Sequence, residues 1–126
     1  MKLSSFLAIK AIISLVYGIG MVLVPAAFLP LYGITLDPAG TFMARAVGAT
    51  LIGIGLVCWF ARSIADRAGL QGIILALFIA DTIGFIVALH AQLSGLMNTL
   101  GWSDVGIWLL LALGLGYFRF LKPNTS

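Results

Sequence analysis

Long apolar runs separated by short polar segments dominate the chain, and each run is long enough to cross a lipid bilayer as a helix. A bilayer core of about 30 Å requires roughly 20 apolar residues in helical conformation. The run at residues 70–93 contains no Lys, Arg or Glu, and the intervening segments hold Gly, Pro, Asn and Asp. The pattern predicts four membrane-spanning helices, at about residues 6–29, 38–61, 70–93 and 102–121.

Composition supports a membrane location. Of 126 residues, 62% are hydrophobic and 9% are charged, whereas a soluble domain has about a quarter of its residues charged. We predict an all-α membrane protein with one domain, residues 1–126, folded as an antiparallel four-helix bundle. The first run resembles a secretory signal ending at VPAA, but its apolar character continues to Leu31, so we expect a retained helix. Pro25 and Pro30 should kink and end it.

The basic residues predict an orientation. With four crossings, both termini and the 62–69 loop share one side, and six of the seven basic residues belong to that side. The positive-inside rule therefore places both termini in the cytoplasm. Lys10, one turn inside the first helix, is expected to extend its side chain to the same surface. Because the charges are divided between the chain ends and one loop, no nucleic-acid partner is indicated.

Asp81 is the most informative polar residue of the predicted helices. At about 1.5 Å per residue it lies roughly 17 Å along its helix, near the middle of the bilayer. An Asp at that depth costs about 2.5–3.5 kcal/mol, so it should face the bundle interior. Tyr17, Thr50 and Trp108 lie at similar depth, and we predict a buried polar layer of Tyr17, Thr50 and Asp81. We favour a hydrogen-bonded clasp that fixes helix register; a proton or cation site is the alternative.

Two further polar residues leave alternatives open. Arg45, about two turns inside the second helix, either pairs with Asp81 or extends to the outer headgroups. His90 is nine residues from Asp81 and therefore faces the opposite side of its helix. We favour an interfacial hydrogen-bonding role for His90, with ligation of haem or chlorophyll as the alternative. The expectation for the chain is no cofactor.

Small residues at helical spacing predict close helix packing, because they let backbones approach in lipid. The sequence contains no nucleophile–base set, phosphate-binding loop or metal-spaced cluster, and it has one His, one Cys and no Glu. We therefore expect no enzymatic activity and no metal site. The predicted packing positions are Ala76, Ala80, Gly84 and Ala88 on the third helix and Gly48 and Gly53 on the second.

A turn with LYGI and DPAG, followed by ARAVGATLIGIGLVCWFAR, resembles the small four-helix bacterial inner-membrane proteins of the DoxX-like type. The resemblance implies a multi-pass protein of the bacterial inner membrane with an accessory role. Some DoxX-like proteins are associated with quinone-linked oxidoreductase complexes. The resemblance supplies no catalytic residues. The first helix has no carboxylate, which distinguishes the chain from the small multidrug transporters.

These observations favour a non-catalytic integral membrane subunit or scaffold that packs against partner helices in a larger complex. The partners would be the lipid bilayer and either other membrane subunits or further copies of the chain. Two alternatives remain at this point. The first is a small proton- or cation-coupled carrier that uses Asp81, and the second is a pigment- or haem-binding subunit that uses His90.

Overall fold

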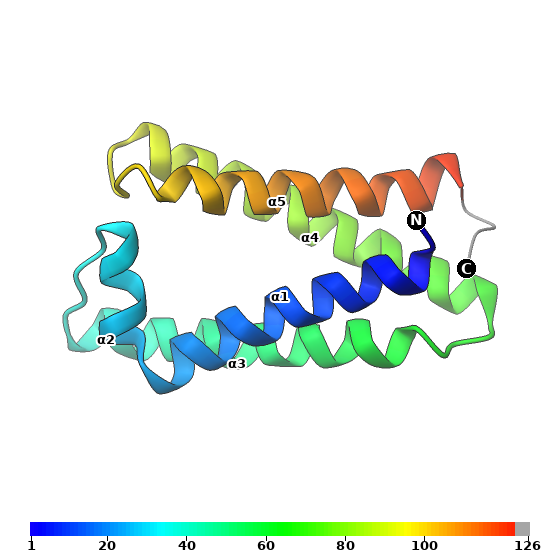
Figure 1. Cartoon of the computed structure of the whole chain (residues 1–126), viewed down its shortest axis with the longest axis horizontal. Coiled ribbons are helices and arrows are strands. Elements are labelled where there is room, and N and C mark those ends of the chain that lie inside the picture. The colour runs from blue at the N-terminus through cyan, green and yellow to red at the C-terminus, as the bar shows by residue number, and fades with distance from the viewer. Residues whose placement is uncertain (123–126) are drawn as a thin grey trace.

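The computed structural model describes residues 1–122, and every regular element in that range is helical (Figure 1). Four helices are long and apolar enough to span a membrane, which confirms the predicted all-helical chain with four candidate spans. Their bounds are α1 Leu3–Leu23, α3 Pro38–Ala61, α4 Arg67–Leu93, and α5 Gly101–Gly116, which continues into the π-helical η2 Tyr117–Leu121.

The first span is shorter than predicted. Helix α1 ends at Leu23 rather than near residue 29, because Pro25 lacks an N–H and its ring clashes with the preceding helical turn. The chain bends at Val24, whose φ of −137° and ψ of 54° are not helical. Two short elements follow, α2 (Pro25–Phe28) and the 3-10 helix η1 (Leu29–Tyr32). They fold back from the α1–α3 side towards the α4–α5 side (Figure 1).

Aspartate caps set the starts of two spans. The Asp37 carboxylate accepts a hydrogen bond from the Gly40 amide at 2.6 Å, and Pro38 occupies the first helical position. The Asp66 carboxylate accepts one from the Gly69 amide at 3.1 Å. Such caps satisfy amide groups that have no partner within the helix. The cap at Asp66 explains why α4 begins at residue 67 and not at residue 70.

The bundle consists of two helix pairs, because α1 packs mainly on α3 and α4 mainly on α5. The closest approach in the first pair joins Gly18 and Gly48. A Cβ atom added to either glycine would lie 2.7 Å from the carbonyl oxygen of the other. The two backbones are therefore in direct contact, as small residues permit between helices in lipid.

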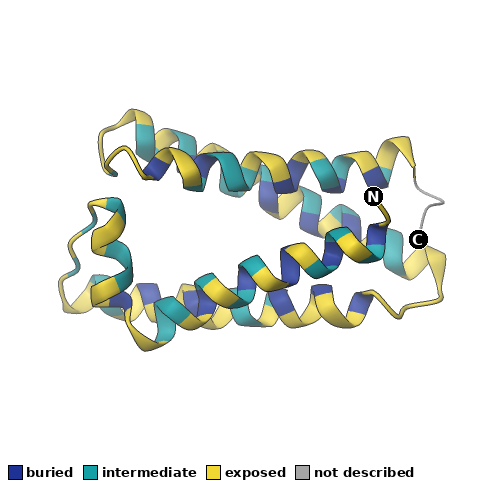
Figure 2. Ribbon diagram, in the orientation of Figure 1, coloured by how far each residue is buried: buried dark blue, intermediate teal, exposed yellow. Residues whose placement is uncertain are grey.

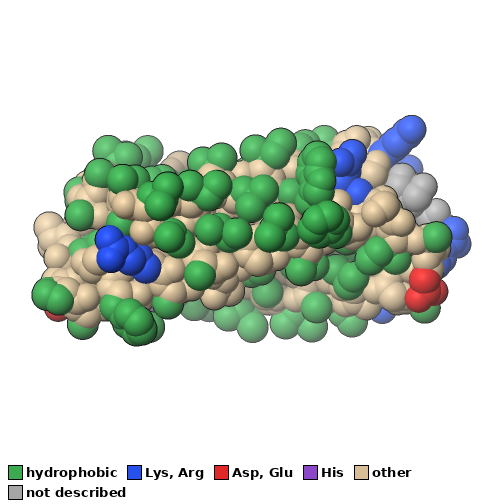
Figure 3. Space-filling view, turned by 90° about the horizontal axis from the view of Figure 1, so that it is seen from below, with side chains coloured by type: hydrophobic (Ala, Val, Ile, Leu, Met, Phe, Trp, Pro, Cys, Tyr) green, Lys and Arg blue, Asp and Glu red, His purple; other side chains and the backbone are tan. Residues whose placement is uncertain are grey.

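The two pairs meet at the end of the bundle that carries the chain termini. There, all four spanning helices contribute to one buried apolar core (Figure 2). The outer surfaces carry exposed apolar side chains along their length, and most of the visible Lys and Arg lie towards the terminal end (Figure 3). The buried core residues are Leu3, Leu7, Ala11, Cys58, Ala61, Ile74, Leu77, Leu115 and Phe118.

Candidate functional site: a cavity between the two helix pairs

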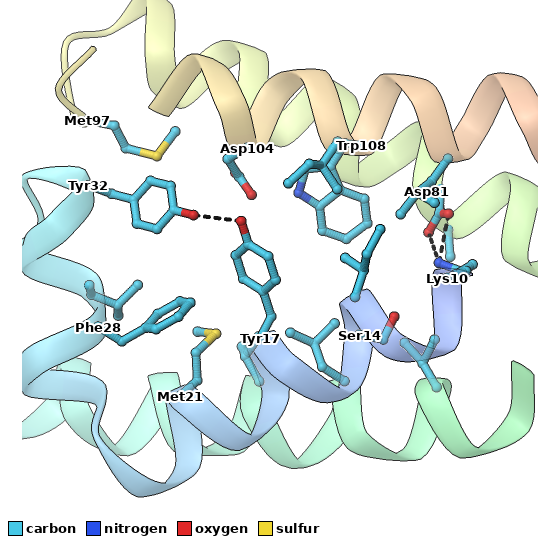
Figure 4. Close-up of a pocket in the computed structure, with 18 of the residues that line it drawn as sticks. Lys10, Ser14, Tyr17, Met21, Phe28, Tyr32, Asp81, Met97, Asp104 and Trp108 are labelled. Carbon is cyan, nitrogen blue, oxygen red and sulfur yellow. Dashed lines mark hydrogen bonds and ion pairs between the residues drawn. The ribbon is translucent and has the colours of Figure 1, made fainter. Parts of the chain in front are cut away.

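Beyond the buried core, a partly open cavity of about 270 Å³ lies between the two helix pairs (Figure 4). Its lining comes from all four spans, from α2 and η1, and from the connections after η1 and α4. Most of its walls are aliphatic, sulfur-containing or aromatic side chains, with a few polar groups among them. The aliphatic walls include Ile13, Leu51, Ile54, Ile107 and Leu111.

A buried ion pair lies at the inner margin of this cavity. The Lys10 ammonium on α1 donates to both carboxylate oxygens of Asp81 on α4, at 2.8 and 3.0 Å (Figure 4). Both residues are almost fully buried, with exposed fractions of 2% and 3%. The structure therefore places Asp81 inside the bundle. The prediction that Lys10 extends to the membrane surface is wrong, because a carboxylate within reach offsets the desolvation of its charge.

The predicted layer of Tyr17, Thr50 and Asp81 does not form. Thr50 is exposed, and its hydroxyl donates to the Ala46 carbonyl of its own helix at 3.1 Å. The rotation of α3 about its axis explains this. Gly48 faces α1, and Thr50, two positions further along the helix, projects about 200° around the axis from Gly48 and therefore away from α1. Arg45 is also exposed, and Asp81 pairs with Lys10 in place of Arg45.

Tyr17 does line the cavity, but its partner is Tyr32 of η1. The two hydroxyl oxygens lie 2.6 Å apart, so one hydroxyl donates to the other. Asn98, in the connection between α4 and α5, holds η1 in place. Its side-chain amide donates to the Leu31 carbonyl at 3.0 Å, and its backbone amide donates to the Tyr32 carbonyl at 2.8 Å. These bonds join the two helix pairs at the end opposite the termini.

Asp104 and Trp108 contribute from α5 and lie one helical turn apart. The Asp104 side chain points into the cavity near the tyrosine hydroxyls (Figure 4). The indole of Trp108 interacts with the Asp104 carboxylate. A Cβ atom on Gly84 would collide with the Trp108 ring, so Gly84 is the position at which α4 makes room for that ring.

Sequence reasoning missed three of these cavity residues. The sequence pattern did not single out Tyr32 or Asp104 as site residues. Lys10 was expected at the membrane surface. The available signal for Tyr32 was the neighbouring prolines, which can turn a segment back onto the bundle. For Lys10, the signal was a basic residue within an otherwise apolar span.

The predicted packing positions separate into three groups. Gly48 contacts α1, Gly84 contacts Trp108, and Ala88 is buried. Ala80 lines the cavity. Ala76 is exposed, and an added Cβ at Gly53 would meet nothing within 4 Å. The row on α4 is therefore not one continuous contact surface within the described chain.

His90 is exposed near the end of α4. Within residues 1–122, no group of three or more His, Cys, Asp or Glu side chains is arranged to hold a metal ion. Cys58 is part of the buried core. Polar side chains from different helices do converge in the cavity, among them Lys10, Tyr17, Asp81 and Asp104.

Neither a curated protein nor a solved structure matches the chain. One family does match, described as a domain of unknown function, DUF8292. The match extends over residues 8–122, and so includes the Lys10–Asp81 pair and the residues that line the cavity. The chain belongs to the DUF8292 family.

Proposed function

We propose that this protein is a non-catalytic membrane protein that binds a small, mainly apolar molecule between its two helix pairs. The observation that carries the proposal is the cavity of about 270 Å³ with its few converging polar groups. Protein interiors are normally close-packed, with few voids larger than a water molecule. A well-formed apolar pocket with a small number of polar groups is typical of a small-molecule site.

Three sets of contacts between the helix pairs support a cavity that persists without a ligand. The apolar core joins the helix pairs at one end, and the Asn98 hydrogen bonds to η1 join them at the other. The Lys10–Asp81 pair links α1 to α4 between these two points. Side chains around an unfilled space lose dispersion contacts, so a molecule of matching shape would regain them.

The proposal includes a location. The basic residues favour cytoplasmic termini in a bacterial inner membrane, consistent with the DoxX-like resemblance. In that orientation the cavity extends from mid-membrane, at Lys10 and Asp81, towards the outer side, and an apolar ligand would reach it from the bilayer. Asp81 then acts as a clasp. Its pairing with Lys10 supports this role over that of an exchangeable proton site.

A scaffold role is the second candidate, and outward-facing small residues favour it. Gly53 on α3 and Gly72 on α4 are exposed, and an added Cβ at either would meet nothing within 4 Å. A partner helix could approach closely at these positions. In that role, Gly53→Leu would lose a co-purifying partner while keeping the thermal stability of the isolated chain.

The cavity itself can be tested by filling it. Ile107→Trp adds bulk to the cavity wall, whereas Leu110→Trp places the same ring on the outer face of the same helix. Two probes of equal shape cover neutral and charged ligands: tert-butylbenzene and phenyltrimethylammonium. A bound probe raises the unfolding temperature of the folded state in detergent. We expect at least one probe to stabilise the wild type and Leu110→Trp, but not Ile107→Trp. Equal stabilisation of both variants would contradict binding in the cavity.

A further inference from the structure

An aromatic cluster forms the end of the cavity furthest from the chain termini. The rings of Tyr17 and Phe28 meet edge to face, with centroids 5.3 Å apart. The centroid of the Tyr32 ring lies 6.1 Å from that of Phe28 and 6.5 Å from that of Tyr17. Trp108 faces this cluster from α5 (Figure 4). Aromatic faces attract cations within about 6 Å of the ring centroid, and groups of such rings recognise quaternary ammonium ligands.

The Asp104 carboxylate lies at the same end of the cavity as this aromatic cluster. Lys10 is the single basic residue among the described residues that line the cavity, and its hydrogen bonds go to Asp81. The lining residues therefore offer Asp104 no basic partner of its own. In the Tyr17–Tyr32 pair one hydroxyl proton is used between the rings, so the other can donate to a neighbouring acceptor. Asp104 points towards that pair (Figure 4).

We propose that the ligand of this cavity is a small organic cation, an amine or quaternary ammonium with an apolar body. This inference rests on the proposed function. The cationic group would lie between the Asp104 carboxylate and the rings of Tyr32 and Trp108. The apolar body would contact the aliphatic wall at Ile107 and Leu111. A neutral ligand would leave the carboxylate desolvated without a counter-charge, which is unfavourable in an apolar site.

Asp104 also lies in the first turn of α5, where a negative charge is favourable without any ligand. That role explains why a carboxylate is tolerated there. It does not explain four aromatic rings around the same space, three of which come from the opposite helix pair and from α2 and η1. The combination of rings and carboxylate is the basis of the inference.

The experiment compares phenyltrimethylammonium with tert-butylbenzene, which differ in charge but hardly in shape. Trp59→Phe and Trp102→Phe, both at exposed positions, leave Trp108 as the fluorescent reporter in the cavity. We expect the cation to bind at least tenfold more tightly than the neutral probe. Asp104→Asn should abolish this preference. Asp37→Asn should keep it, because this control removes the same charge from the same end of the protein and retains a helix-capping side chain.

The outcomes separate the two proposals. If both probes bind equally, or if the preference survives Asp104→Asn, the cation inference is overturned and binding in the cavity stands. If neither probe binds, both proposals fail. Should Asp104→Asn not fold, Tyr32→Leu provides a second variant, because it removes one of the two rings proposed to contact the cation and leaves every charge in place. Tyr32→Leu should weaken binding of the cation at least threefold more than binding of the neutral probe, and equal weakening would count against the aromatic site.

Discussion

The two ends of the bundle use the same four helices in opposite ways. At the end with the termini, buried side chains from every span pack together in one apolar core. Towards the other end the helix pairs separate around a cavity lined by aromatic and ionisable groups. Both halves are strongly apolar, so overall hydrophobicity does not account for the difference. The difference lies in the contacts between the two helix pairs. At the end with the termini these contacts are packed apolar side chains, whereas around the cavity they are a few polar interactions.

Physical chemistry in lipid explains why those few contacts matter. Apolar surfaces gain little by leaving lipid for the protein interior, so close packing and polar bonds determine how helices associate. Within each pair, packing suffices, as at Gly18 and Gly48. Between the pairs, the cavity half relies on Lys10–Asp81 and on the Asn98 bonds. Perturbing each kind of contact in turn tests this division.

The largest expected effect concerns which end faces the cytoplasm. In a Cys58→Ala background, a cysteine at Thr35 or Thr99 lies at the cavity end, and one at Ala65 lies at the core end. A membrane-impermeant thiol reagent applied to intact spheroplasts should label the first two fully. It should label Ala65→Cys only after the membrane is permeabilised. Labelling of Ala65→Cys in intact spheroplasts would reverse the proposed orientation.

Next in size is the loss of the ion pair. Asp81→Leu leaves the buried Lys10 charge unpaired and should lower the free energy of unfolding by about 3–5 kcal/mol, measured by unfolding in detergent. Asp81→Asn should also destabilise, because an amide cannot neutralise an ammonium. The double variant Lys10→Met/Asp81→Leu should recover much of the loss. If the double variant is as unstable as the sum of its single variants, the two residues are not coupled.

A smaller effect is expected where the helices of one pair touch. Gly48→Ala forces a methyl group against the Gly18 carbonyl and should destabilise by about 1–3 kcal/mol. Gly53→Ala on the same helix meets no atom within 4 Å and should be neutral, or stabilise by up to about 1 kcal/mol through helix propensity. Unfolding temperatures in one detergent give the comparison. A similar shift in both variants would exclude a tight α1–α3 contact at Gly48.

The spans were predictable because apolar length and capping chemistry are local properties. The second span was predicted at residues 38–61 and begins and ends there, since Asp37 and Pro38 mark its start. The partners of polar residues were not predictable in the same way. Lys10 and Asp81 are 71 positions apart, and their contact depends on how α1 and α4 are rotated and tilted. Thr50 was misplaced for the same reason, because its direction depends on the glycine contact between α1 and α3.

The unequal lengths of the spans connect the cavity to the thickness of the membrane. Helix α1 has 21 residues and α4 has 27, which correspond to about 32 Å and about 40 Å at 1.5 Å per residue. The longer helix fits the same bilayer by tilting, and Figure 1 shows α4 crossing the bundle obliquely behind α5. A thicker bilayer favours a more upright α4, and a thinner one a more inclined α4. Because α4 carries Asp81 and contributes Ala80 to the cavity wall, we expect the width of the cavity to change with lipid acyl-chain length.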